Sequence, residues 1–218
     1  MNSIATVPLE QRIAARLEAG SVDFVLHDGD AEWQTLAAGT PMADAGVLCA
    51  FVDRPQPTVL LTRRPSHMRK HSGQVAFPGG RQDPEDEDII ATALREAREE
   101  VGLHSHHVSI IGTVPFYRTV TNYRVTPVLA VIPPDLELVP QPSEVARIFE
   151  VRCDHLFDPA MQRQQFVEWQ GGTRHYWEVH ADGERIWGAT AGMLRNIGAL
   201  LGLDADPCAL NCDAGAMP

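Results

Sequence analysis

The segment that decides the fold runs from Leu60 to Leu103 and reads LLTRRPSHMRKHSGQVAFPGGRQDPEDEDIIATALREAREEVGL. It divides into a cation-rich loop, a Phe-Pro-Gly-Gly turn at residues 77–80, and a predicted helix that starts near residue 86 and ends at residue 101. On a helical wheel, four apolar residues form one stripe that faces a core, namely Ile90, Leu94, Ala97 and Val101. The helix is therefore predicted to pack on one side and to carry charge on the other.

The charged side of this helix carries Glu96, Glu99 and Glu100. At 100° per residue Glu96 and Glu100 lie about 40° apart, away from the apolar stripe and with Glu99 beside them, so we expect one shared solvent-side face. Like charges at these spacings cost roughly 0.2–0.5 kcal/mol per pair. A bound divalent cation reverses that cost, because Mg2+ takes carboxylate, phosphate and water oxygens as ligands. A solvated acidic face is the alternative interpretation.

The loop before the helix supplies the opposite charge. Residues 63–71 contain six basic side chains: Arg63, Arg64, His67, Arg69, Lys70 and His71. Such a cluster attracts anions locally even on an acidic protein. Cations that bind an anion, followed closely by carboxylates that bind a cation, suit a metal-chelated phosphate ester. For each basic residue taken singly, a solvated loop side chain is the alternative.

Residues 95–103, Arg-Glu-Ala-Arg-Glu-Glu-Val-Gly-Leu, resemble the second half of the Nudix box, Arg-Glu-apolar-x-Glu-Glu-x-Gly-apolar. The first half of that box has a glycine, five residues, an acid, and seven residues before the arginine. Asp86 has the expected spacing from Gly80, whereas Glu87 has the expected spacing from Arg95. The first acid of the box is therefore either Asp86 or Glu87.

Residues 60–80 resemble the additional signature of the coenzyme A pyrophosphatase branch of the Nudix family. The resemblance implies an α+β fold, the Nudix α/β/α sandwich with a mixed β-sheet. It also implies Mg2+- or Mn2+-dependent hydrolysis of the diphosphate of coenzyme A or acyl-CoA, giving adenosine 3′,5′-bisphosphate and (acyl-)4′-phosphopantetheine. Alternatives are hydrolysis of another nucleoside diphosphate derivative, such as NADH or ADP-ribose, and a non-catalytic nucleotide-binding Nudix domain. The family analogy further suggests a homodimer.

The same resemblance assigns roles to individual residues. The expected metal ligands are Glu96, Glu99 and Glu100, and the expected catalytic residues are Glu96, Glu99 and Arg95. Glu99 serves as a third ligand or as the base, and Arg95 orients a carboxylate or is an ordinary i,i+4 partner of Glu99. The expected substrate-binding residues are Arg63, Arg64, Arg69, His71, Gly79 and Gly80. Glu144 either returns a distant carboxylate to the metal or is a surface residue.

Composition limits the class of protein. With 218 residues and 44% hydrophobic content, the chain suffices for one sizeable core. A net charge of −11 argues against broad nucleic-acid binding, which needs basic surface. The sequence shows neither a secretory signal nor an apolar run long enough to span a membrane, so we expect a cytoplasmic protein without a membrane partner. Cys208 and Cys212 have no second pair nearby, and we expect no functional role for them.

Patterning along the chain predicts the remaining elements. Helices are expected at residues 5–19 and 190–201, and strands at residues 46–52, 58–62, 74–77, 108–114 and 125–132. Residues 164–188 alternate aromatic and polar side chains and predict a hairpin that turns near Asp182 and Gly183, and we expect the aromatics from Trp169 to Trp187 to lie in the core. We therefore expect a helical and irregular extension at 1–44, a Nudix domain at 45–203 and a disordered tail at 204–218.

Overall fold

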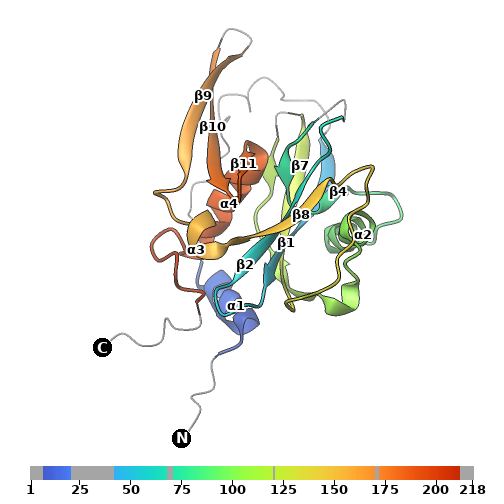
Figure 1. Cartoon of the computed structure of the whole chain (residues 1–218), viewed down its shortest axis with the longest axis vertical. Helices are drawn as coiled ribbons and strands as arrows, with labels where there is room; N and C mark the ends of the chain where they lie inside the picture. Colours follow the sequence, from blue (N-terminus) through green and yellow to red (C-terminus); the bar gives the residue numbers. More distant parts are fainter. Residues whose placement is uncertain (1–6, 21–41, 68–70, 120, 170–171, 212–218) are drawn as a thin grey trace, which may run out of the picture.

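The computed structural model describes residues 7–20, 42–67, 71–119, 121–169 and 172–211 (Figure 1). In chain order, its elements are α1 (Leu9–Ala19), β1 (Ala43–Val52), β2 (Thr58–Arg63), β3 (Val75–Ala76), β4 (Gly79–Arg81), α2 (Ile89–Val101), the 3-10 helix η2 (Ser105–His107), β5 (Ser109–Thr113), β6 (Tyr117–Arg118), β7 (Tyr123–Ile132), β8 (Arg147–Arg152), α3 (Cys153–Leu156), β9 (Arg163–Trp169), β10 (Gly172–Ala181), β11 (Glu184–Trp187) and α4 (Ala189–Leu200). None of the described helices is long and apolar enough to cross a membrane.

A mixed sheet forms the centre of the molecule. Its strands run in the order β3-β2-β1-β7-β5, with β4 paired to β1, β6 to β7 and β8 to β2. β1 pairs in parallel with β7 over its whole length and antiparallel with β2, in a register that places Phe51 opposite Val59. The predicted strands at residues 46–52 and 58–62 are thereby confirmed as neighbours in one sheet.

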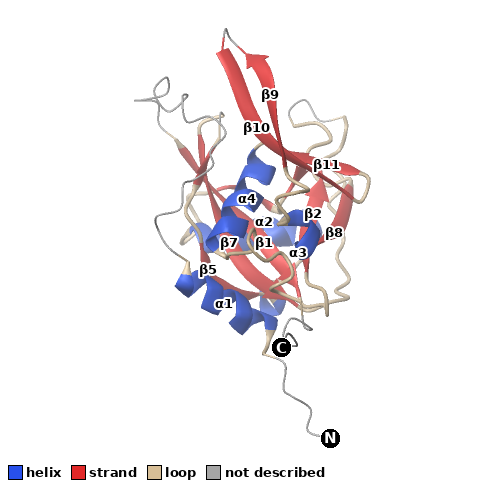
Figure 2. Cartoon of the chain, turned by 90° about the vertical axis from the view of Figure 1, so that its left-hand side faces the viewer, coloured by secondary structure: helices blue, strands red, loops and turns tan. Residues whose placement is uncertain are grey.

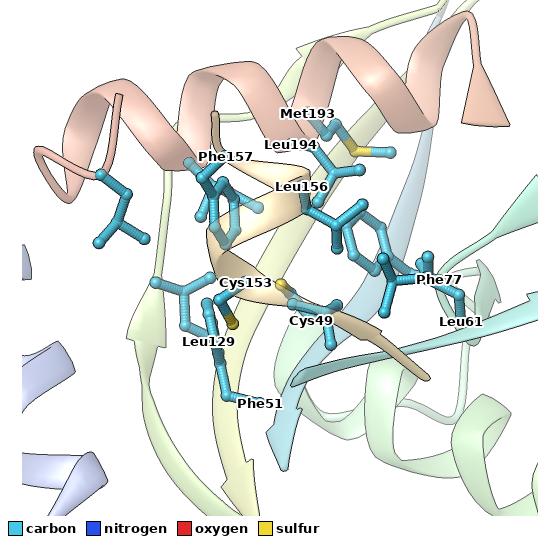
Figure 3. Packing of buried hydrophobic residues seen from close by; sticks show 14 of the residues in the cluster. Cys49, Phe51, Leu61, Phe77, Leu129, Cys153, Leu156, Phe157, Met193 and Leu194 are labelled. Carbon is cyan, nitrogen blue, oxygen red and sulfur yellow. The ribbon is translucent and has the colours of Figure 1, made fainter. Parts of the chain in front are cut away.

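Alternate side chains of β1 are buried in two separate hydrophobic cores, one on each face of the sheet. Leu48, Ala50 and Val52 pack with α2 on one face. Cys49 and Phe51 point to the other face, into a core that also contains residues of α3 and α4, such as Leu156 and Leu194 (Figure 3). This alternation follows from the two-residue period of a strand that is covered on both sides. The predicted α/β/α sandwich is confirmed.

α2 begins later than the sequence pattern indicates. Asp88 is its N-cap, and the Asp88 side chain accepts a hydrogen bond from Ala91 N at 2.8 Å. The predicted start near residue 86 is therefore wrong, because Asp88 satisfies the first free amide groups. The helix ends at Val101, as predicted. Gly102 follows it in the left-handed conformation, with φ 70°, which residues with a Cβ atom rarely adopt.

Three strands, β9, β10 and β11, form a second sheet. β10 and β11 turn at residues 182–183, as predicted, but β9 and β10 project beyond the main sheet (Figures 1 and 2). Val179 and Ile186 are buried against the body of the protein, whereas Phe166 and Trp187 are exposed. The prediction that the aromatic residues from Trp169 to Trp187 form core is therefore wrong for Trp187.

Both ends of the described chain pack on the core that contains α4. Leu9 and Ile13 of α1 are buried in it, and so is Leu210. The Leu210 carbonyl accepts a hydrogen bond from the Arg12 guanidinium. The predicted disorder is therefore wrong for residues 204–211, while residues 212–218, including Cys212, lie outside the described residues. Cys208 is a free thiol on the surface.

Candidate active site

The three helical carboxylates do not share one solvent-side face. The exposed fraction of the side chain is 60% for Glu99 but only 15% for Glu96 and 4% for Glu100. The prediction is wrong for the last two because parts of the chain distant in sequence cover this side of α2. These parts are the start of β4, the end of β2 and the loop at residues 133–146.

Glu100 lies against the glycine turn and the arginine loop. Gly79 N donates a hydrogen bond to Glu100 Oε2 at 3.1 Å, and Arg64 Nη1 lies 3.8 Å from Glu100 Oε1. Burial raises the pKa of Glu100 to about 7, against the opposing effect of these two groups. The predicted anion-binding loop and the predicted metal-binding helix thus meet at one carboxylate.

Glu96 lies directly over Gly80. A Cβ atom at Gly80 would lie 2.4 Å from Glu96 Oε1, so a larger residue at this position would displace the carboxylate. Burial raises the pKa of Glu96, and the negative charges of Glu99 and Glu144 act in the same direction. The close approach of backbone and carboxylate explains the second glycine of the turn.

Glu144 belongs to the same electrostatic environment. Its charge contributes to the raised pKa of both Glu96 and Glu100. Its loop is fixed at two points, because Gln141 N donates to the Glu100 carbonyl at 2.8 Å and Ala146 N donates to the Arg63 carbonyl at 2.8 Å. Of the two interpretations of Glu144 from sequence, this placement favours the returning carboxylate.

Arg95 connects the acids of the box. Its Nε and Nη2 atoms donate to the two carboxylate oxygens of Asp86, each at 3.0 Å, and its Nη1 atom donates to Glu96 at 2.9 Å and to Glu99 at 3.2 Å. The Arg95 guanidinium holds the pKa of Asp86 down at about 2. Glu87 is exposed. The structure therefore places Asp86, and not Glu87, with the box, and Arg95 does more than pair with Glu99.

The two arginines at the start of the loop go to different places. Arg64 reaches Glu100, whereas Arg63 forms an ion pair with Glu184 at 3.4 Å. Because successive side chains of a strand point to opposite faces, the end of β2 cannot direct both toward α2. His71 is exposed and hydrogen-bonded to Gln74 at 2.8 Å. Arg69 lies outside the described residues.

Sequence reasoning missed Glu184, although the Asp-Gly turn beside it was visible. That turn fixes the register of β11 and thereby the direction of Glu184. This Asp-Gly turn is therefore the sequence signal that could have indicated the position of Glu184.

The donor set suits a hard divalent ion. Within the described ranges, no three His, Cys, Asp or Glu side chains already form a group that could hold a metal ion. Glu96 and Glu100 nevertheless lie close enough for the charge of the first to raise the pKa of the second, after the larger effect of burial. Mg2+ commonly takes one or two carboxylates and completes its shell with waters and phosphate oxygens. Two acids beside the glycine turn fit that requirement.

Comparison with known proteins identifies the family. A family model described as the NUDIX domain matches residues 42–177. The protein named Uncharacterized Nudix hydrolase NudL of Enterobacter sp. (strain 638) is 42% identical over 159 residues, which cover 73% of this chain and 83% of that protein. Its counterpart in Escherichia fergusonii is 41% identical with the same coverage. A Nudix hydrolase from M. smegmatis, RenU, is 26% identical with a TM-score of 0.46, over 53% of this chain and 73% of that one. The chain belongs to the Nudix hydrolase family.

Proposed function

We propose that the chain hydrolyses the diphosphate of coenzyme A or acyl-CoA to adenosine 3′,5′-bisphosphate and (acyl-)4′-phosphopantetheine. The observation that carries the proposal is the 3.8 Å approach of Arg64 Nη1 to Glu100 Oε1, which joins the basic loop to the acidic helix in one site. The choice of coenzyme A among nucleoside diphosphate derivatives rests on the motif at residues 60–80.

Nudix hydrolases generally use divalent metal cations, and we propose Mg2+ or Mn2+ held by Glu96 and Glu100, with Glu99 as a third ligand or as the base. When bound, the ion supplies Lewis-acid activation and lowers the pKa of a coordinated water. Gly79 N–H fixes the direction of the Glu100 carboxylate through its 3.1 Å hydrogen bond. We expect Arg64, together with Gly79 and Gly80, to bind diphosphate oxygens, because Arg64 and Gly79 both approach Glu100.

Hydrolysis forms a bond from a water oxygen to one phosphorus and breaks the bond from that phosphorus to the bridging oxygen. The water proton must pass to a base. Glu99 and Glu144 are the exposed carboxylates near Glu96, and both act on its pKa. Replacing each by glutamine identifies the base, because the variant that lacks it loses kcat with little change in KM. Arg95 positions Glu96 and Glu99 through hydrogen bonds of 2.9 and 3.2 Å.

Steady-state kinetics on a substrate panel test the proposal. The panel contains coenzyme A, dephospho-coenzyme A, NADH and ADP-ribose, each with Mg2+ or Mn2+. We expect kcat/KM to be highest for coenzyme A, and at least about tenfold higher than for dephospho-coenzyme A, because a charged hydrogen bond to the 3′-phosphate contributes roughly 1.5–3 kcal/mol. Preference for a substrate without the 3′-phosphate would contradict the choice of coenzyme A.

A further inference from the structure

Two arginines face each other at the end of the main sheet nearest the site. In the pairing of β2 with β8, Arg63 lies opposite Arg147. Like charges placed opposite each other on neighbouring strands destabilise a sheet. Glu184 offsets this repulsion, because its Oε1 atom lies 3.4 Å from Arg63 Nη1 and 2.9 Å from Arg147 Nη1. One carboxylate oxygen therefore bridges the ends of two strands.

The β10–β11 turn is built to deliver this carboxylate. Asp182 and Gly183 adopt positive φ angles of 53° and 75°, the backbone of a two-residue hairpin turn. Asp182 also binds Arg147 through its side chain, at 2.5 Å, and through its carbonyl, at 3.3 Å. The Glu184 side chain is only 11% exposed. Removing its charge leaves Arg147 with Asp182 but takes from Arg63 the carboxylate with which it pairs.

The strand end held by Glu184 supports two parts of the candidate active site. The Arg63 carbonyl accepts a hydrogen bond from Ala146 N at 2.8 Å, which fixes the loop that carries Glu144. The next residue, Arg64, donates its backbone N–H to the Gln74 carbonyl at 2.9 Å and directs its side chain to Glu100. A shift of this strand end therefore moves Arg64 and Glu144 together.

We propose that Glu184, supported by Asp182, is a positioning residue that holds the end of β2 so that Arg64 and the Glu144 loop face Glu100. Glu184 lies beyond residues 42–177, the part of the chain that the family model matches. Arg63, predicted to bind substrate, belongs to this ion-pair network. This proposal rests on the proposed function in one respect, namely that Arg64 and Glu144 take part in diphosphate hydrolysis.

The test compares Glu184→Gln with Glu178→Gln. Glu178 is a matched control in the same small sheet, with a side chain 8% exposed and an ion pair to Arg185 at 2.6 Å. None of its ion pairs or hydrogen bonds reaches β2 within the described part of the chain. We expect Glu184→Gln to lower kcat/KM by about tenfold or more, because small displacements of binding groups are costly. Glu178→Gln should change it less than about twofold at a similar loss of thermal stability.

A double-mutant cycle separates positioning from general destabilisation. If Glu184 acts through Arg64, Glu184→Gln lowers kcat/KM much less in the Arg64→Ala background than in the wild type. Equal effects in the two backgrounds, or equal activity of Glu184→Gln and Glu178→Gln, would overturn the proposal. If Glu184→Gln does not fold, Arg63→Gln replaces it, since Arg147 then still satisfies Glu184.

These outcomes can be separated from failure of the proposed function. Rates are measured on the best substrate of the panel, whichever nucleoside diphosphate derivative it is. Failure of the coenzyme A proposal appears as a different best substrate for the wild type, whereas failure of the Glu184 proposal appears only in the variants.

Discussion

Replacing Glu100 by glutamine should stabilise the metal-free protein while it abolishes activity. Burial raises the pKa of this carboxyl from 4.5 to about 7. That difference corresponds to roughly 3 kcal/mol by which folding disfavours the ionised form. Because the folded protein binds this proton more tightly than the unfolded chain, stability falls as pH rises from about 4.5 to about 7. Glutamine carries no charge and keeps an oxygen for the hydrogen bond from Gly79 N.

The assay is thermal unfolding in EDTA near pH 5 and near pH 8. At about 2–4 °C per kcal/mol for a chain of this size, the Glu100→Gln variant should melt up to roughly 6–12 °C above the wild type near pH 8, and the difference should shrink near pH 5. Adding Mg2+ or Mn2+ should then raise the melting temperature of the wild type more than that of the variant, because an ion that binds only the folded state stabilises it by about 2.7 kcal/mol at a hundred times its Kd.

Glu99→Gln is the control for this prediction, since its side chain is 60% exposed and its charge is not confined by burial. It should change the melting temperature near pH 8 in EDTA much less than Glu100→Gln does. A Glu100→Gln variant that is less stable than the wild type near pH 8 would show that neighbouring groups offset the free-energy cost of burying the charge of Glu100. The expectation that a cation relieves the cost of the buried charge of Glu100 would then be wrong.

Three further substitutions test the arrangement around the box. Asp86→Asn should lower activity and stability, because it removes the charge that pairs with Arg95 through two 3.0 Å hydrogen bonds. Glu87→Gln should be nearly neutral. Equal losses in both variants would contradict the assignment of Asp86 as the first acid of the box. Since the pKa of Asp86 is lowered to about 2, its contribution to stability should be present above about pH 4 and be lost as pH falls toward 2, which acid unfolding of the wild type and Asp86→Asn measures. Gly80→Ala should lower kcat by displacing Glu96, whose Oε1 would lie 2.4 Å from the new Cβ, and an unchanged kcat would show that this carboxylate can move freely.

Local patterning predicted much of the scaffold. The apolar runs at residues 46–52 and 58–62 gave the β1–β2 pair, and the stripe that includes Ala97 and Val101 gave the buried side of α2. These features depend on the period of the apolar residues within one element. Contacts between distant segments were not accessible in this way, so the cover over Glu100 and the packing of Leu210 were missed.

The site was predicted in outline and corrected in detail. The motif predicted that the basic loop approaches the acidic helix, as Arg64 and Glu100 do. The opposite direction of Arg63 could also have been predicted, because successive side chains of a strand point to opposite faces. The choice between Asp86 and Glu87 could not be predicted, because both lie before the helix and contacts in the folded chain, such as the hydrogen bonds of Arg95, distinguish them.

The most direct measurement is product analysis by mass spectrometry after incubation with coenzyme A, Mg2+ and 18O-labelled water. We predict equimolar adenosine 3′,5′-bisphosphate and 4′-phosphopantetheine, with one labelled oxygen in one of the two products, and no products above background from folded Glu100→Gln. Intact coenzyme A with the wild type, or wild-type turnover by Glu100→Gln, would contradict the claim that the buried acids of α2 and the loop of Arg64 form a site for diphosphate hydrolysis.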